Sequence, residues 1–182
     1  MLFRSADSLD WLEPVCWRDV CAKAKKADIE AFGYGKGYTA ALDAWRGLLA
    51  RLETVLARGL HVCLVAHSRV RQAHEPGVVD SWDRYELKLL QAASALLTEW
   101  ADHVLFCNHE TLVDSAEGRR SVGVSTGKRI VYTQPTAAYA AKARWPIAER
   151  IEYPYAERAA SVWIEVLASK AAGMPEIGRA HV

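Results

Sequence analysis

The stretch Leu60-His61-Val62-Cys63-Leu64-Val65-Ala66-His67-Ser68 decides the fold. It is an apolar run that begins after Gly59 and stops at a polar pair, which is the pattern of a parallel strand buried on both faces. In open α/β sheets the carboxyl ends of the strands carry the ligand site. We therefore expect His67 and Ser68 to lie where the protein meets its substrate.

Helix and strand patterns alternate on both sides of this strand. Apolar spacing and apolar runs predict helices over residues 10–26, 41–55 and 84–101, and strands over residues 60–66 and 103–107. Asp10 and Glu13 have the spacing of a capping box at the start of the first helix. Because strands alternate with helices, the sequence predicts an α/β fold with a parallel sheet.

The remaining segments are less regular. Residues 69–84 are polar and predict an exposed loop. Residues 111–113 and 129–133 flank the glycine-containing stretch 118–127 and predict an antiparallel hairpin at the sheet edge. A last helix over about 155–171 is expected to pack four side chains inward: Ala156, Ala160, Trp163 and Leu167.

Composition narrows the function classes. At 182 residues with 51% hydrophobic content the chain can bury a core, and its length suggests one domain. Its 23 Lys and Arg nearly cancel 22 Asp and Glu, so no overall field attracts nucleic acid or a membrane. No apolar run approaches the roughly 20 residues of a membrane span, and we expect a cytoplasmic protein.

The four cysteines do not form a metal-binding pattern. Cys16, Cys21, Cys63 and Cys107 show neither a CxxC nor a Cys/His spacing, and two of them lie inside predicted strands. This distribution is typical of reduced thiols in a cytosol. We therefore expect no structural zinc.

The two ends have a different character from the rest. Residues 2–5 and 176–182 resemble translations of the two ends of a sequencing adapter. We therefore treat residues 1–5 and 176–182 as non-native tails and leave them out of the fold prediction. The alternative is a genuine start at Met1.

Five motifs carry a family resemblance. In chain order they resemble motifs of the phage-type RecA-like P-loop ATPases, AAA ATPase-like proteins usually called phage nucleotide-binding or ATP-binding proteins. They are Asp7-Ser8-Leu9-Asp10-Trp11-Leu12-Glu13, Phe32-Gly33-Tyr34-Gly35-Lys36-Gly37-Tyr38, Val65-Ala66-His67-Ser68, Asp83-Arg84-Tyr85-Glu86-Leu87-Lys88 and Trp100-Ala101-Asp102-His103-Val104-Leu105-Phe106. The likeness covers residues 6–148, and residues 149–175 are expected to form a separate helical segment.

The resemblance implies a RecA-like P-loop NTPase core, with a mostly parallel sheet and an edge β-hairpin. In that family a Walker A strand lies between the strands expected at 60–66 and 103–107, so these two are not direct neighbours. The Walker A loop precedes the Walker B aspartate, and Asp7 matches that aspartate. The resemblance therefore implies an N-terminally truncated domain whose Asp7 and Ser8 hold Mg²⁺, Asp7 through a water. On local grounds alone, Asp7 and Ser8 equally suit a helix cap.

No phosphate-binding loop follows from the sequence. The pattern GxxxxGK[ST] does not occur. Residues 33–39 have the wrong spacing and follow a helix instead of a strand, while Thr126-Gly127-Lys128 is expected in a hairpin turn. We reject both as phosphate loops.

The resemblance gives roles to four further residues. His67 matches a sensor that hydrogen-bonds the terminal phosphate or the attacking water, a task that suits a neutral donor, and Ser68 lies beside it at the nucleotide. Lys142 and Arg144 resemble cations that ring and filament ATPases project onto a neighbour's γ-phosphate, although Ala143 replaces the family's usual Asn. A structural histidine and a solvated charge pair are the alternatives.

Single-stranded DNA is the candidate polymer partner. Two groups of aromatic and basic side chains suit stacking and backbone contacts: Tyr34, Lys36 and Tyr38, and Arg69 and Arg71 in the predicted loop. Aromatic packing on a helix is the alternative.

Two functions remain open. The first is a fragment of an ATP-binding, DNA-dependent ATPase of phage or prophage recombination or replication. It would need ATP and Mg²⁺ in the complete protein, assemble as a homo-oligomeric ring or filament, work in the bacterial host cytoplasm, and be inactive as given. The second is a noncatalytic α/β binding or scaffold domain.

Overall fold

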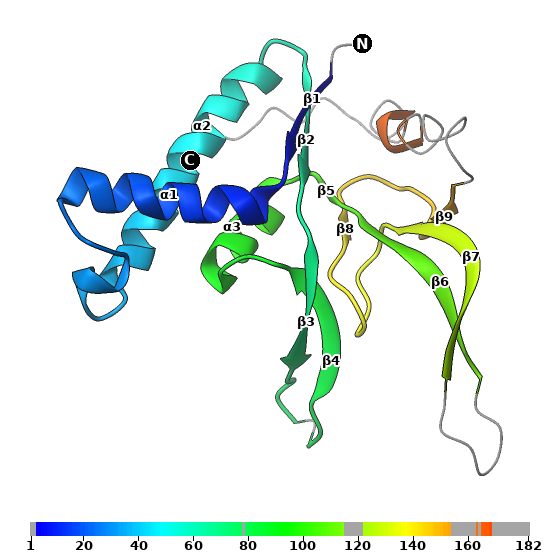
Figure 1. The fold of residues 1–182 in the computed structure, drawn as a ribbon. Coiled ribbons are helices and arrows are strands. Elements are labelled where there is room, and N and C mark those ends of the chain that lie inside the picture. Colours follow the sequence, from blue (N-terminus) through cyan, green and yellow to red (C-terminus); the bar gives the residue numbers. More distant parts are fainter. Residues whose placement is uncertain (1–2, 78, 115–121, 154–162, 164, 169–182) are drawn as a thin grey trace. The chain divides into compact units, whose positions relative to one another are not determined.

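The computed structural model describes residues 3–77, 79–114, 122–153, 163 and 165–168. The chain divides into two compact units, Met1–Trp100 and Ala101–Val182, where its length alone suggests one domain (Figure 1). Each unit is described by itself. Among the described residues, none of the helices has the length and apolar character needed to cross a membrane.

Unit 1 contains three α-helices and four strands among its described residues. In chain order its elements are β1 (Phe3–Asp7), α1 (Leu9–Ala24), the short 3₁₀ helix η1 (Glu30–Phe32), α2 (Lys36–Leu56), β2 (His61–Val65), β3 (Ser68–Ala73), β4 (Trp82–Leu87) and α3 (Gln91–Trp100).

Strands β1 and β2 form a parallel pair. The register runs from Phe3 opposite His61 to Asp7 opposite Val65, and the two strands lie side by side in Figure 1. The parallel strand predicted at 60–66 is therefore confirmed, but it is not buried on both faces, because residues 61–64 are half-buried and Val65 is exposed. Residues 3–5, which the sequence analysis leaves out of the fold, take part in this pairing.

The exposed loop predicted over residues 69–84 is wrong. Strands β3 and β4 form an antiparallel hairpin, from Ser68 opposite Leu87 to Ala73 opposite Trp82. Both strands are mostly polar, and a strand without an apolar face shows no alternation that a sequence pattern can detect. Because β4 extends to Leu87, helix α3 begins at Gln91 and not near residue 84.

The core of unit 1 lies between its three helices. Trp45 and Leu89 are each 1% exposed, and the buried cluster also contains Leu9, Leu49, Ala93 and Leu97. The apolar positions at helical spacing on α2 and α3 meet here. This packing explains why the two helices were recognisable from the sequence.

The start of α1 differs from the predicted capping box. Ser8 is the N-cap and makes no side-chain cap, because its hydroxyl donates to Asp10 Oδ1 at 2.6 Å. Glu13 turns into the fold, where its two carboxylate oxygens accept the Leu90 N–H at 3.0 and 3.1 Å. Tertiary hydrogen bonds have thus replaced the local ones.

Unit 2 is built from antiparallel strands. They are β5 (His103–Val104), β6 (Phe106–Asp114), β7 (Val122–Tyr132), β8 (Lys142–Ala143) and β9 (Arg150–Glu152). Strand β5 pairs with β8, and β6, β7 and β9 form a three-stranded sheet in that order. Strand β9 lies in the stretch for which a helical segment was expected.

The predictions of a mostly parallel sheet and of one parallel strand over 103–107 are wrong, because among the described strands only β1 and β2 pair in parallel. This run is divided between β5 and β6, and both halves pair antiparallel. An apolar run predicts burial but does not specify a partner. For β6 the partner is the next strand, β7, and such a hairpin costs little loop-closure entropy. The predicted hairpin itself is confirmed, with strands longer than expected, but it belongs to this separate sheet.

The core of unit 2 lies on β7 and β9. Val131, Ile151 and Val166 are buried together, and Leu105, Ile147 and Tyr153 pack against them. Residues 165–168 are helical, with Val166 as the buried position, whereas Trp163 is 36% exposed and not packed inward as predicted. Ala156 and Ala160 lie outside the described residues.

Candidate functional site

The polar residues singled out in the sequence meet at one edge of the parallel pair. Asp7 ends β1 and is opposite Val65, the last residue of β2. The two strands run in the same direction, so His67 and Ser68 follow β2 at the edge where Asp7 ends β1 (Figure 1). This edge is the carboxyl edge at which α/β sheets bind ligands.

Asp10 is the centre of this edge. Its Oδ1 accepts hydrogen bonds from Ser8 Oγ at 2.6 Å and from the His67 backbone N–H at 3.2 Å. The ring nitrogen His67 Nδ1 lies 3.1 Å from both carboxylate oxygens, and Lys88 Nζ lies 3.9 Å from Oδ2. We call Ser8, Asp10, His67 and Lys88 the Asp10 cluster.

Burial and charge are unequal within the cluster. The Asp10 side chain is 5% exposed, whereas that of His67 is 65% exposed. Burial by itself would raise the pKa of Asp10, but hydrogen bonds from Ser8 and from the His67 backbone outweigh it and hold this pKa well below its usual range. Asp10 is therefore an ionised carboxylate that anchors an exposed imidazole.

Glu13 anchors the turn that carries Lys88. Its carboxylate is 7% exposed and accepts the Leu90 N–H, while the Arg69 guanidinium donates to the Leu89 carbonyl. Burial raises the pKa of Glu13, and the Leu90 hydrogen bond and the Arg69 charge oppose this shift. Helix α1 thus holds the β4–α3 turn as well as the residues after β2.

Sequence reasoning missed Asp10 and Lys88 as site residues. Asp10 has the spacing of a helix cap, and Lys88 ends a motif to which no role was given. Their positions were the available signal, because Asp10 lies three residues after the end of β1 and Lys88 directly follows the end of β4.

Lys142 and Arg144 lie in unit 2, apart in the sequence from the Asp10 cluster. Lys142 belongs to β8, opposite Val104. Arg144 Nη1 forms an ion pair with Asp102 Oδ1 at 2.7 Å, and its backbone N–H donates to the Asp102 carbonyl. The Arg144 side chain remains 55% exposed.

The aromatic residues proposed for DNA differ in their surroundings. Tyr34 is fully exposed, with a positive φ of 50°, and Lys36 is exposed at the start of α2. Tyr38 instead donates a hydrogen bond to Glu30 and contacts Trp17 edge to face, with ring centroids 5.4 Å apart. Tyr34 and Lys36 are therefore the more accessible members.

The basic residues of β3 are also engaged. Arg69 donates to the Leu89 carbonyl, and Arg71 Nη1 lies 3.8 Å from Glu86 Oε2 across the hairpin. The two arginines come from alternate positions of one strand, so they project from the same face of the hairpin.

Neither look-alike of a phosphate loop has the required setting. Residues 33–39 follow η1, and no strand directly precedes them. Thr126-Gly127-Lys128 lies within β7 at a register shift opposite Glu110, with φ of 78° at Gly127, and not in the hairpin turn that was expected. The rejection of residues 33–39 agrees with this setting.

The donor set at the strand edge fits part of a magnesium site. In the part of the chain that the structure describes, no three His, Cys, Asp or Glu side chains gather closely enough to hold a metal ion. Asp7 is an exposed carboxylate at a strand end, and Mg²⁺ is commonly bound through one or two carboxylates with phosphate oxygens and water as its other ligands. Asp7 therefore suits Mg²⁺ that arrives with a phosphate.

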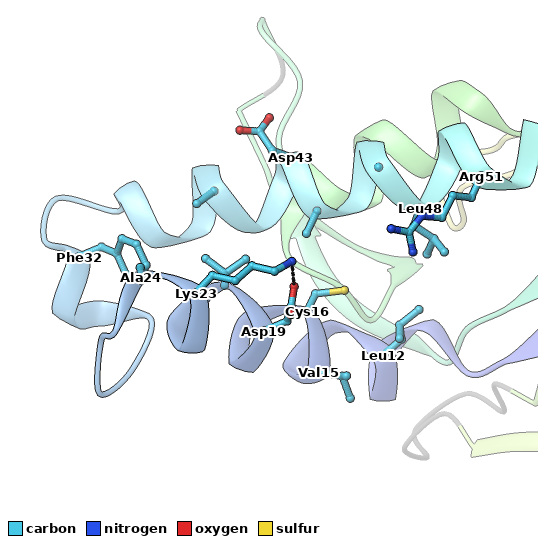
Figure 2. A pocket seen from close by; sticks show the side chains of 14 residues that line it. Leu12, Val15, Cys16, Asp19, Lys23, Ala24, Phe32, Asp43, Leu48 and Arg51 are labelled. Atoms are coloured by element: carbon cyan, nitrogen blue, oxygen red, sulfur yellow. Dashed lines mark hydrogen bonds and ion pairs between the residues drawn. The ribbon is translucent and has the colours of Figure 1, made fainter.

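An open groove of about 970 Å³ lies between α1 and α2 (Figure 2). Leu12, Cys16 and Leu48 line it, and Lys23 forms an ion pair with Asp19 at 2.6 Å. Burial, aided by nearby carboxylates, raises the pKa of the Cys16 thiol, which keeps it unreactive. No residue of the Asp10 cluster lines this groove.

The chain was compared with protein-family models, curated proteins and solved structures. The family model described as the AAA domain matches residues 6–145. A search of the curated proteins found no match, and neither did a search of the solved structures.

Proposed function

Because the chain belongs to the AAA-domain family, we propose that it forms the part of a phage-type, RecA-like ATPase that orients Mg²⁺ and the attacking water. The AAA-domain match covers the residues of the strand edge, from Asp7 through Lys88. The proposal of a phage-type, RecA-like ATPase rests on the chemistry of that edge.

The main support for this proposal is that Asp7 and His67 lie together at the carboxyl edge of a parallel pair of strands. Asp7 is opposite the last residue of β2, and His67 follows two residues later on a ring held by Asp10. Phosphoryl transfer requires charge stabilisation and positioning of the nucleophile more than covalent chemistry. A carboxylate for Mg²⁺ and an oriented imidazole supply those two needs.

The nucleotide needs a phosphate cradle from elsewhere. The 182 residues contain no GxxxxGK[ST], and neither look-alike follows a strand. Asp7 would order the water around Mg²⁺, with Ser8 beside it, and Ser68 would lie next to the nucleotide. The complete ATPase therefore joins these residues to a phosphate-binding loop, and the chain alone is inactive.

Assembly and DNA are part of the same proposal. Lys142 and exposed Arg144 act on the nucleotide of a neighbouring subunit in a homo-oligomer, and Arg144 leaves Asp102 to do so. Tyr34 and Lys36 offer an exposed ring and cation for single-stranded DNA, and Tyr38 on α2 with Arg69 and Arg71 on β3 are the further candidates.

The test is steady-state ATP hydrolysis by the chain joined to the phosphate-binding loop that its gene encodes. We expect hydrolysis that single-stranded DNA stimulates, and its loss in Asp7→Asn. Asp43→Asn is the matched control, because Asp43 is an exposed carboxylate on α2 that pairs locally with Arg46 at 2.6 Å. Absence of hydrolysis in the wild-type protein would favour a noncatalytic scaffold domain.

A further inference from the structure

The contacts between the His67 ring and Asp10 are made at the Nδ1 edge of the ring. Its Nδ1 lies 3.1 Å from Oδ1 and 3.1 Å from Oδ2 of Asp10, and its backbone N–H donates to the same carboxylate. The His67 carbonyl accepts the Lys88 N–H at 2.8 Å. Backbone and ring are therefore both fixed, while the side chain stays 65% exposed.

An ionised carboxylate only accepts hydrogen bonds, so Nδ1 must carry a proton to bond with it. Asp10 Oδ1 also accepts hydrogen bonds from Ser8 Oγ at 2.6 Å and from the His67 backbone N–H at 3.2 Å, which is the acceptor-only role of a carboxylate. A flipped ring would turn carbon toward a carboxylate that is 5% exposed and would remove one of its donors. The Nδ1 edge is thus the edge that faces Asp10.

A neutral imidazole has one donor and one acceptor nitrogen. With Nδ1 donating to Asp10, Nε2 is the acceptor. Lys88 Nζ also lies near this carboxylate, 3.9 Å from Oδ2. The exposed edge of His67 consequently offers a lone pair and no N–H.

We infer that Asp10 is a positioning residue that holds His67 as its Nδ1–H tautomer, so that Nε2 accepts a hydrogen bond from the attacking water. An acceptor nitrogen is repelled by a phosphate oxygen, which is also an acceptor, but bonds with a water O–H. This proposal differs from the expectation that His67 acts as a neutral donor. The hydrogen bond from Nε2 to the attacking water rests on the proposed function. The assignment of the Nδ1–H tautomer does not depend on that function.

The experiment records long-range ¹H–¹⁵N correlations of histidine rings in the ¹⁵N-labelled 182-residue chain at about pH 8, where ordinary imidazoles are neutral. His67 is identified by the signal that His67→Gln removes. We expect protonated Nδ1 and unprotonated Nε2 at His67. His74, exposed in the β3–β4 connection, is the internal reference for a solvated ring.

Variants separate positioning from general folding. Asp10→Ala should move His67 to the tautomer mixture shown by His74, whereas Lys88→Gln should leave Nδ1 protonated. An Nε2–H tautomer in the wild-type protein, or a ring protonated on both nitrogens, overturns the inference even if Asp10→Ala fails to fold. Because no nucleotide is present, this result is independent of whether the complete protein hydrolyses ATP.

Discussion

Replacing Glu13 by alanine removes a carboxylate that is 7% exposed and that accepts the Leu90 N–H through both oxygens. A hydrogen bond to a charged group contributes about 1.5–3 kcal/mol, and an unsatisfied buried donor costs about 1–3 kcal/mol. Since Leu90 is only half-buried, we expect the free energy of unfolding to fall by about 2–3 kcal/mol. For a chain of this size Tm then falls by roughly 4–12 °C.

Glu13→Gln is the matched variant. Its amide oxygen still accepts the Leu90 N–H, so we expect a loss of less than about 1 kcal/mol at pH 7. Burial raises the pKa of Glu13 from its ordinary value of 4.5. Protonated Glu13 therefore stabilises the folded state fully below pH 4.5, and this stabilisation is lost as the pH rises through the folded pKa. Because Glu13→Gln does not titrate, its stability relative to the wild type should increase over the same pH range.

The assay is thermal and urea unfolding followed by circular dichroism, with amide hydrogen exchange at Leu90 as the local probe. Faster Leu90 exchange in Glu13→Ala than in Glu13→Gln is the expected result. Equal stability of Glu13→Ala and the wild type, or equal damage by both substitutions, would refute the assignment of Glu13 as the anchor of the β4–α3 turn.

Two further predictions concern the nucleotide. Calorimetric titration of the 182-residue chain with Mg-ATP should show no saturable heat, because its sequence contains no GxxxxGK[ST] pattern to supply phosphate-binding amides and a lysine, and micromolar binding would reveal an unrecognised site. In the complete protein, Asp7→Asn and Arg144→Ala should each lose hydrolysis, Arg144→Ala by a factor of about 10³ to 10⁵ with nucleotide binding retained, and an equimolar mixture should regain activity above either variant. Full activity of Arg144→Ala alone would leave Lys142 and Arg144 as surface charges.

The sequence predicted the parts of the fold in which one pattern has one meaning. The apolar run of β2 ends at a polar pair, and α2 repeats its apolar residues at helical spacing, so both elements were predictable. Strands β3 and β4 were not predicted because polar residues occur on both faces of each strand. Only the backbone pairing between them identifies them as strands. The partner of residues 103–107 was also hidden, since an apolar run does not encode strand direction.

The site was predicted in the same partial way. His67 was found because it follows an apolar run that predicts a strand, but Asp10 was interpreted as a helix cap. An aspartate in the first turn of a helix serves equally as a local cap or as a tertiary acceptor, and only the arrival of His67 from 57 residues away decides between them. Glu13 was misread for the same reason, because its acceptor bond goes to Leu90.

We propose that Asp7 and His67 act on one nucleotide at the carboxyl edge of β1 and β2. Single-turnover ATP hydrolysis by the complete protein, measured beside the equilibrium affinity for Mg-ATP, tests it most directly. We predict that His67→Ala slows the single-turnover rate by about 10² to 10⁴ while the affinity for Mg-ATP stays nearly constant, because His67 contacts the attacking water and not the bound phosphates. An unchanged single-turnover rate in His67→Ala would contradict the account.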